Sequence, residues 1–158
     1  MPDKTAIYAG SFDPITNGHI DIIHRARRVF DRVIILVMQH SQKSGWLGLS
    51  DRIALVRAAV KTDAGCHVDT VSGLLAYYAK SHQIQTLIRG LRAVSDFDYE
   101  AQMALTNREL YSGLDTVFFM TSRAYTYLSS STVRELVLHN APVDHLVPAC
   151  VSDFIEKR

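Results

Sequence analysis

Short apolar runs alternate along the chain with longer amphipathic segments. The short runs are rich in β-branched residues and predict strands at 5–9, 33–38, 67–71, 86–89 and 116–120. Apolar residues at helical spacing predict helices at 19–30, 51–62, 74–82, 97–111, 131–139 and 148–157. Because strands and helices alternate, we expect an α/β fold: a doubly wound, five-stranded parallel sheet with helices on both faces.

Local signals add detail to this expected fold. The run 33–37 is continuously apolar, as in a strand buried on both faces. Ser50 precedes the helix at 51–62, and Thr132 and Glu135 have the spacing of a capping box. No repeat, linker or low-complexity segment divides the chain, so we expect one domain over 1–158. Ligands of such sheets bind beyond the carboxyl ends of the strands, where the strand order reverses.

Composition narrows the class of protein. Hydrophobic residues make up 47% and charged residues 21% of the chain, as in ordinary globular proteins. The longest apolar run is too short to cross a bilayer, and the polar start shows no signal-peptide pattern, so we expect a cytoplasmic protein. Cys66 and Cys150 are therefore expected to be reduced. A net charge of +1 gives no reason to expect a nucleic-acid or membrane surface.

The loop after the first strand carries the first candidate chemistry. Gly10 and Gly18 allow close approach of a ligand to the backbone, and Ser11 adds a hydrogen-bond donor. His19 opens the next helix, where unpaired N–H groups favour phosphate. The alternative is a structural loop with a surface histidine, and we interpret Asp13-Pro14 mainly as turn chemistry. Residues 16–19, Thr-Asn-Gly-His, resemble the [H/T]xGH signature of the nucleotidyltransferase superfamily.

A second motif strengthens this resemblance. Residues 128–135, Leu-Ser-Ser-Ser-Thr-Val-Arg-Glu, are similar to the superfamily's (I/L)SS(S/T)xxR element. Hydroxyl and N–H groups at the positive end of a helix can bind a triphosphate, although the same residues could simply cap the helix.

Two arginines lie between these motifs. Arg89 and Arg92 lie where the fourth strand should end, and a guanidinium at this position could bind phosphate with two donors. They could instead be solvated and balanced by Asp96, Asp98 and Glu100. The block 89–100 (RGLR…DFDYE) and the stretch 10–23 resemble the phosphopantetheine adenylyltransferase family over nearly the whole chain.

The resemblance implies a reaction and a set of residue roles. ATP and 4′-phosphopantetheine would give dephospho-coenzyme A and pyrophosphate. The implied catalytic residues are His19, Lys43 and Arg92, and the implied phosphopantetheine-binding residues are Ser11, Lys43, Leu75 and Arg89. The implied ATP-binding residues are Ser11, Phe12, His19, Gly90, Leu91, Arg92, Glu100, Tyr125, Thr126, Tyr127, Leu128, Ser129, Ser130 and Ser131. The loop 40–46 around Lys43 departs from the family's pattern, which makes the contact of Lys43 the least secure of the basic ones.

The family also implies partners and a mechanism. An ionised acceptor phosphate needs alignment and charge stabilisation rather than a strong general base, and His19 would donate a hydrogen bond to the α-phosphate. We see no metal cage in the sequence, so Mg²⁺ would arrive with the nucleotide. A homohexamer, with the helix at 97–111 in one interface, and feedback inhibition by coenzyme A are further family expectations.

Other functions remain open at this stage. A related nucleotidyltransferase with another phosphorylated acceptor, such as a cytidylyltransferase or a nicotinamide-mononucleotide adenylyltransferase, shares the two end motifs. A non-catalytic nucleotide-binding module would not explain why both motifs and the arginines occur together. The chain lacks the KMSKS-like loop of a class I aminoacyl-tRNA synthetase, the ligand spacing of a zinc site and an RNA-binding motif.

Overall fold

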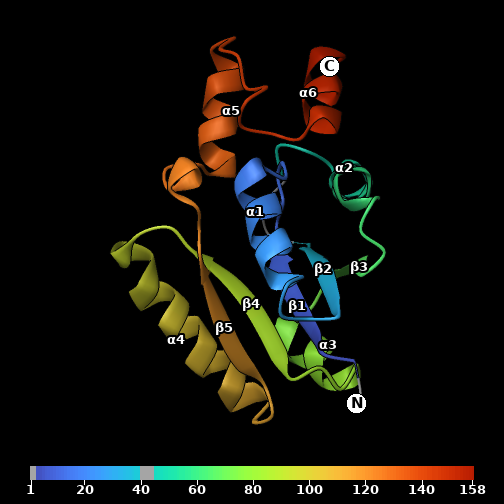
Figure 1. Ribbon diagram of the computed structural model, residues 1–158, viewed down its shortest axis with the longest axis vertical. Helices are drawn as coiled ribbons and strands as arrows, with labels where there is room; N and C mark the ends of the chain where they lie inside the picture. The colour runs from blue at the N-terminus through green and yellow to red at the C-terminus, as the bar shows by residue number, and fades with distance from the viewer. Residues whose placement is uncertain (1–2, 40–44) are drawn as a thin grey trace.

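A five-stranded parallel sheet forms the centre of the molecule, in the order β3-β2-β1-β4-β5 (Figure 1). The computed structural model describes residues 3–39 and 45–158. The strands are β1 (Thr5–Gly10), β2 (Arg32–Met38), β3 (Cys66–Val71), β4 (Thr86–Leu91) and β5 (Asp115–Met120). The helices are α1 (Asn17–Ala26), α2 (Leu49–Val60), α3 (Leu75–Ser81), α4 (Val94–Leu110), α5 (Ser130–Leu138) and α6 (Ala149–Glu156). The predicted α/β class and sheet are confirmed.

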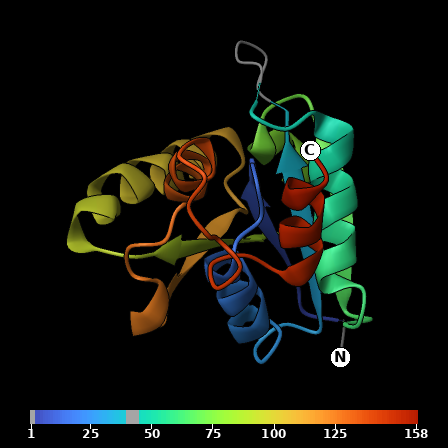
Figure 2. The same ribbon diagram turned by 90° about the horizontal axis from the view of Figure 1, so that it is seen from above.

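Helices cover both faces of the sheet, because successive strand residues point to opposite sides. Ala6 and Tyr8 of β1 belong to a core cluster with residues of α1, α2, α5 and α6. Ile7 and Ala9 belong to a second cluster with α3 and the end of α4. Figure 2 shows α6 beside α2, away from α4. The two apolar layers explain why β1 is buried on both faces.

The strand order reverses between β1 and β4, and these strands separate toward their carboxyl ends. Backbone pairing between them is limited to Ile7 with Leu87 and Tyr8 with Ile88. Beyond that point, Nη1 of Arg89 donates to the carbonyl oxygen of Ala9 across 2.8 Å. The gap between the strand ends is the position at which sheets of this kind bind ligands.

Two predicted helix caps are wrong. Helix α2 begins at Leu49 after Gly48, so Ser50 lies inside its first turn. Helix α5 is capped by Ser129, whose Oγ accepts a hydrogen bond from the Thr132 N–H across 3.0 Å. A run of hydroxyl residues offers several possible caps, and the sequence spacing alone selected the wrong one.

The end of β4 also differs from the prediction. The strand continues to Leu91, because Arg89 and Gly90 pair with Phe118 and Phe119 of β5. Arg89 therefore lies inside the strand rather than at its end.

Candidate active site

Two neighbouring pockets open at the carboxyl ends of β1 and β4. The first, of about 470 Å³, is lined by His19 and Ile22 of α1. The second, of about 390 Å³, is lined by Leu75 of α3 and Met103 of α4, on the opposite face of the sheet. The residues that line both are Ala9, Gly10, Ser11, Arg89, Tyr99 and Glu100. The pockets thus meet along one shared wall at the strand ends.

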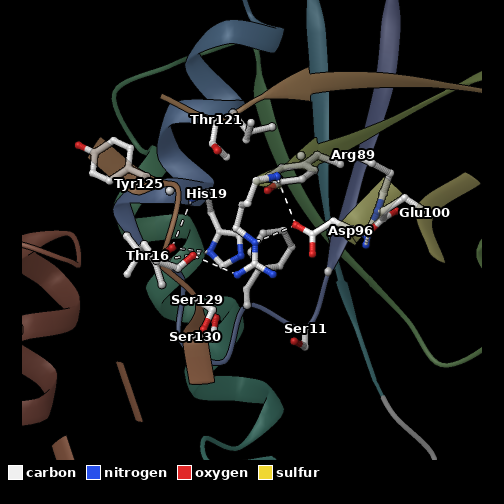
Figure 3. A pocket seen from close by; sticks show the side chains of 18 of the residues that line it. Ser11, Thr16, His19, Arg89, Asp96, Glu100, Thr121, Tyr125, Ser129 and Ser130 are labelled. Carbon is white, nitrogen blue, oxygen red and sulfur yellow. Dashed lines mark hydrogen bonds and ion pairs between the residues drawn. The ribbon is translucent and has the colours of Figure 1, made fainter. Parts of the chain in front are cut away.

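Three distant segments of the chain converge on the first pocket. His19 comes from α1, Arg92 follows β4, and Ser130 begins α5. Figure 3 shows His19 at the centre of this group, with Ser129 and Ser130 on one side and Arg89 and Glu100 on the other. The predicted site residues in its lining are Ser11, Phe12, His19, Arg89, Gly90, Arg92, Glu100, Tyr125, Leu128, Ser129 and Ser130.

The remaining predicted residues lie elsewhere. Leu75 lines the second pocket only. Leu91, Thr126, Tyr127 and Ser131 are absent from the lining of both, and Tyr127 is 92% exposed. Lys43 lies outside the described residues, so its predicted contact stays a prediction.

His19 is held in one tautomer by the start of its own helix. The Thr16 N–H donates to Nδ1 of His19 across 2.9 Å, and the His19 N–H donates to Oγ1 of Thr16, which completes a capping box. An amide N–H cannot accept a hydrogen bond, so Nδ1 carries no proton and the ring proton of the neutral imidazole is on Nε2. Nε2 is then the donor that remains available to a ligand.

The surroundings of His19 keep it neutral. Burial, together with the positive charges of Arg92 and Arg89, lowers the pKa of His19 from 6.5 to about 4. The Phe12 ring packs against the imidazole, with centroids 5.0 Å apart and planes at 67°. Phe12 is itself buried at 2% exposure. Phe12 therefore packs against the imidazole of His19 and also lines the first pocket.

Arg89 forms a two-pronged ion pair with Glu100. Its Nε and Nη2 donate to the carboxylate across 2.7 and 2.6 Å. Hydrogen bonds to Glu100 raise the pKa of Arg89 although burial opposes this. The alternative of an arginine balanced by acidic residues is therefore correct for this side chain, although it is not fully solvated. A phosphate on Arg89 would share the guanidinium with Glu100.

Arg92 is held more loosely than Arg89. Its Nε lies 3.4 Å from the Asp96 carboxylate, and its Nη1 donates to the Leu128 carbonyl oxygen across 3.3 Å. The side chain of Arg92 is 41% exposed, so it can turn toward a ligand in the first pocket.

Direct hydrogen bonds join the two sequence motifs. Oγ of Ser130 donates to the Pro14 carbonyl oxygen across 2.8 Å, and Nη1 of Arg134 donates to the Asp13 carbonyl oxygen across 2.6 Å. Ser131 Oγ accepts a hydrogen bond from Arg134, and the Thr132 hydroxyl bonds to that of Ser129, so all four hydroxyls of the second motif have partners inside the protein. The capping alternative is thus also partly correct.

Asp13 does more than shape a turn, which corrects our interpretation of Asp13-Pro14. Its carboxylate accepts hydrogen bonds from the N–H groups of Trp46 and Leu47, each across 2.8 Å. It thereby ties the loop after β1 to the segment before α2. An acid followed by proline was the available signal, but its partners, 33 and 34 residues away, could not be predicted.

Several other lining residues were not predicted as site residues. They include Tyr8, Thr16, Leu74, Asp96, Tyr99, Met103, Asn107 and Thr121. Asp96 and Tyr99 stand within the block that suggested the family, so their position was a usable signal.

Within 3–39 and 45–158, no group of three or more His, Cys, Asp or Glu residues is arranged to hold a metal ion. None of the helices in these ranges is long and apolar enough to cross a bilayer.

Comparison with solved structures supports the fold. A crystal structure of a candidate nicotinate-nucleotide adenylyltransferase from Vibrio parahaemolyticus superposes with a TM-score of 0.71 at 17% identity. The match covers 98% of this chain and 99% of that chain. At this low identity the likeness concerns the fold alone.

Sequence comparison provides evidence on the family as well as on the fold. The profile of the Cytidylyltransferase-like family matches residues 7–136. Phosphopantetheine adenylyltransferases of Alkaliphilus metalliredigens and Geobacter sulfurreducens are each 48% identical to this chain, with 98% and 100% of it covered and 99% and 96% of the relatives. That of Geotalea daltonii is 45% identical, with 100% of this chain and 98% of the relative covered. The chain therefore belongs to the phosphopantetheine adenylyltransferase family.

Proposed function

We propose that this protein transfers the adenylyl group of ATP to 4′-phosphopantetheine, giving dephospho-coenzyme A and pyrophosphate. Family membership supports the reaction. The observation that carries the proposal is the wall formed by Ser11, Arg89 and Glu100 between two pockets on opposite faces of the sheet. Two substrates bound from the two sides would bring their phosphates together at this wall.

The linings of the pockets suggest which substrate binds where. The first pocket combines a histidine, Arg92 and the start of α5, which suit a polyphosphate and its nucleoside. The second pocket presents Leu74, Leu75 and Met103 beside the amide of Asn107, which suit a flexible arm containing apolar groups and amides. We therefore place ATP in the first pocket and the pantetheine arm in the second.

The chemistry requires little covalent help from the protein. The attacking group is a phosphate oxygen that is ionised near neutral pH, so the site needs to align the reactants and stabilise charge. In our proposal, the Nε2–H of His19 donates to an oxygen of the α-phosphate as negative charge builds there. Arg92 stabilises the charge on the departing pyrophosphate, and Arg89, held by Glu100, orients the acceptor phosphate. Lys43 keeps its proposed role between the substrates.

Mg²⁺ would enter with ATP. The carboxylates of Asp96 and Glu100 are those in the described lining, and each is paired with an arginine. These residues do not fit a resident metal ion, so phosphate oxygens and water would hold Mg²⁺.

Assembly and regulation are further parts of the proposal. Apolar side chains are exposed on α4 and β5, namely Phe97, Tyr99, Met103, Leu105, Val117 and Met120. They offer a surface for the homohexamer that we propose, in a cytoplasmic setting. Coenzyme A contains the product's adenylyl and pantetheine groups, so it could occupy both pockets and inhibit.

Release of pyrophosphate tests the proposed reaction. Purified protein with MgATP is assayed with 4′-phosphopantetheine, nicotinamide mononucleotide, nicotinate mononucleotide or no acceptor, and MgCTP replaces MgATP in a parallel series. We expect release to require ATP and 4′-phosphopantetheine together. Faster release with another acceptor would favour a related nucleotidyltransferase, and ATP binding without turnover would favour a non-catalytic module.

A further inference from the structure

Arg52 of α2 places a buried positive charge beside the active-site loop. The residue is 6% exposed, and its Nη1 donates to the carbonyl oxygens of Ser11 across 2.6 Å and Met38 across 3.0 Å. Ser11 follows β1 and Met38 ends β2, so one nitrogen joins the carboxyl ends of two adjacent strands. These hydrogen bonds hold the side chain in place. A neutral donor could satisfy the same two carbonyl groups, so the bonds do not explain why the residue is charged.

The charge of Arg52 has no acidic partner among residues 3–39 and 45–158. No carboxylate of the described residues lies within 4.0 Å of its guanidinium, and the residues outside those ranges include no Asp or Glu. Within the described ranges, its buried Nε also lacks a hydrogen-bond partner. Burying an uncompensated charge is costly, so an anion bound nearby would stabilise this arrangement.

The Ser11–Phe12 peptide links Arg52 to the pockets. The C=O and N–H of a trans peptide point in opposite directions. Because the Ser11 carbonyl points to Arg52, the Phe12 N–H points away from it. Ser11 lines both pockets and Phe12 lines the first, whereas Arg52 lines neither. The Phe12 N–H therefore points away from the guanidinium, in a segment that lines the pockets.

The backbone at Phe12 needs such an anchor. Its φ is 47°, in the left-handed region that non-glycine residues seldom adopt. No described residue accepts a hydrogen bond from its N–H, which leaves this donor available.

We infer that Arg52 is a positioning residue for the phosphates: it holds the Ser11 carbonyl so that the Phe12 N–H faces the bound polyanion. Its charge acts through the polarised peptide, and the bound phosphates supply the missing counter-charge. The identity of the polyanion as ATP or pyrophosphate rests on the proposed function, whereas the role of Arg52 toward polyphosphate does not.

The test compares Arg52→Met with Arg57→Met, which removes the same charge from an exposed position of the same helix. The probe is pyrophosphate, and the readout is the rise in Tm that it causes, alongside kcat. For Arg52→Met we expect less than half of the wild-type rise and about a 100-fold lower kcat at a temperature where circular dichroism shows a folded protein. Arg57→Met is expected to match the wild type in both.

A purely structural role gives a different result. It would lower the Tm of Arg52→Met equally with and without pyrophosphate, leaving the ligand-induced rise and kcat near wild type, and this result would overturn the inference. Arg52→Lys keeps the charge and a donor, so we expect it to recover at least about 10-fold of the lost kcat. If Arg52→Met does not fold, Arg52→Gln, which removes the charge but keeps a donor, decides: a wild-type pyrophosphate-induced rise with wild-type kcat overturns the inference. A wild type that binds pyrophosphate but does not adenylylate phosphopantetheine would refute the proposed function and leave this test valid.

Discussion

The Thr16 N–H donates a hydrogen bond to Nδ1 of His19 across 2.9 Å. This contact caps α1 and at the same time fixes the proton of the imidazole on Nε2. The same hydrogen bond therefore caps the helix and orients the proposed catalytic donor.

Removing the imidazole separates these two roles. His19→Ala is expected to lower kcat by two or more orders of magnitude, since the loss of one such donor costs about 2.7–4 kcal/mol, while the Kd for ATP changes little. His19→Gln can still form the capping box, so its Tm is expected to stay near wild type while kcat remains at least about 10-fold lower. Turnover close to wild type in His19→Ala would remove His19 from the mechanism.

Stability should also depend on the titration of His19. Its pKa is about 4 in the folded protein and near 6.5 when unfolded, so between these values the unfolded state binds more protons. The free energy of unfolding therefore falls as the pH is lowered from 6.5 toward 4. Urea unfolding at pH 7 and pH 5 should show a fall that is larger in the wild type than in His19→Gln, by about 1–2 kcal/mol. Equal falls would mean that the histidine titrates normally.

Arg92 and Arg89 are expected to bind different substrates. Arg92 lines the first pocket only, so Arg92→Met is expected to raise the KM for ATP by about 10-fold or more, with a smaller effect on the acceptor. Arg89→Met should raise chiefly the KM for 4′-phosphopantetheine. Because this change leaves Glu100 without its partner, the double variant Arg89→Met/Glu100→Gln serves as the stability control. The reverse pattern of KM changes would exchange the two pockets.

The carboxylate of Asp13 is expected to hold the segment that begins at residue 45 in place. Asp13→Ala removes both acceptors from the Trp46 and Leu47 N–H groups, and we expect a loss of about 2 kcal/mol of unfolding free energy. Trp46 is the single tryptophan of the chain, so its emission reports directly on this segment. A red shift is expected in Asp13→Ala but not in Asp31→Ala, whose exposed carboxylate accepts from the Lys4 N–H instead. Unchanged emission in Asp13→Ala would contradict the anchoring role.

Sequence periodicity was sufficient for the sheet but not for the contacts that shape the site. The run 33–37 predicted a strand because it is continuously apolar, as in a strand covered on both faces. The edge strands β3 and β5 contain no fully buried residue and were predicted from their β-branched residues. The family motifs led to His19 and Arg92. The roles of Asp13, Arg52 and Arg134 depend on backbone groups 14 to 121 residues away, and no local pattern encodes such partners. The pairing of Arg89 with Glu100 was visible as a possibility, but only the geometry shows that both donors are engaged.

A crystal structure with α,β-methylene-ATP and 4′-phosphopantetheine tests the central claim most directly. We predict the nucleotide beside His19 and Arg92, the pantetheine arm beside Leu75 and Met103, and the α-phosphorus between the acceptor phosphate and Nε2 of His19. Both ligands on one face of the sheet, or an α-phosphate out of hydrogen-bonding reach of His19, would contradict it.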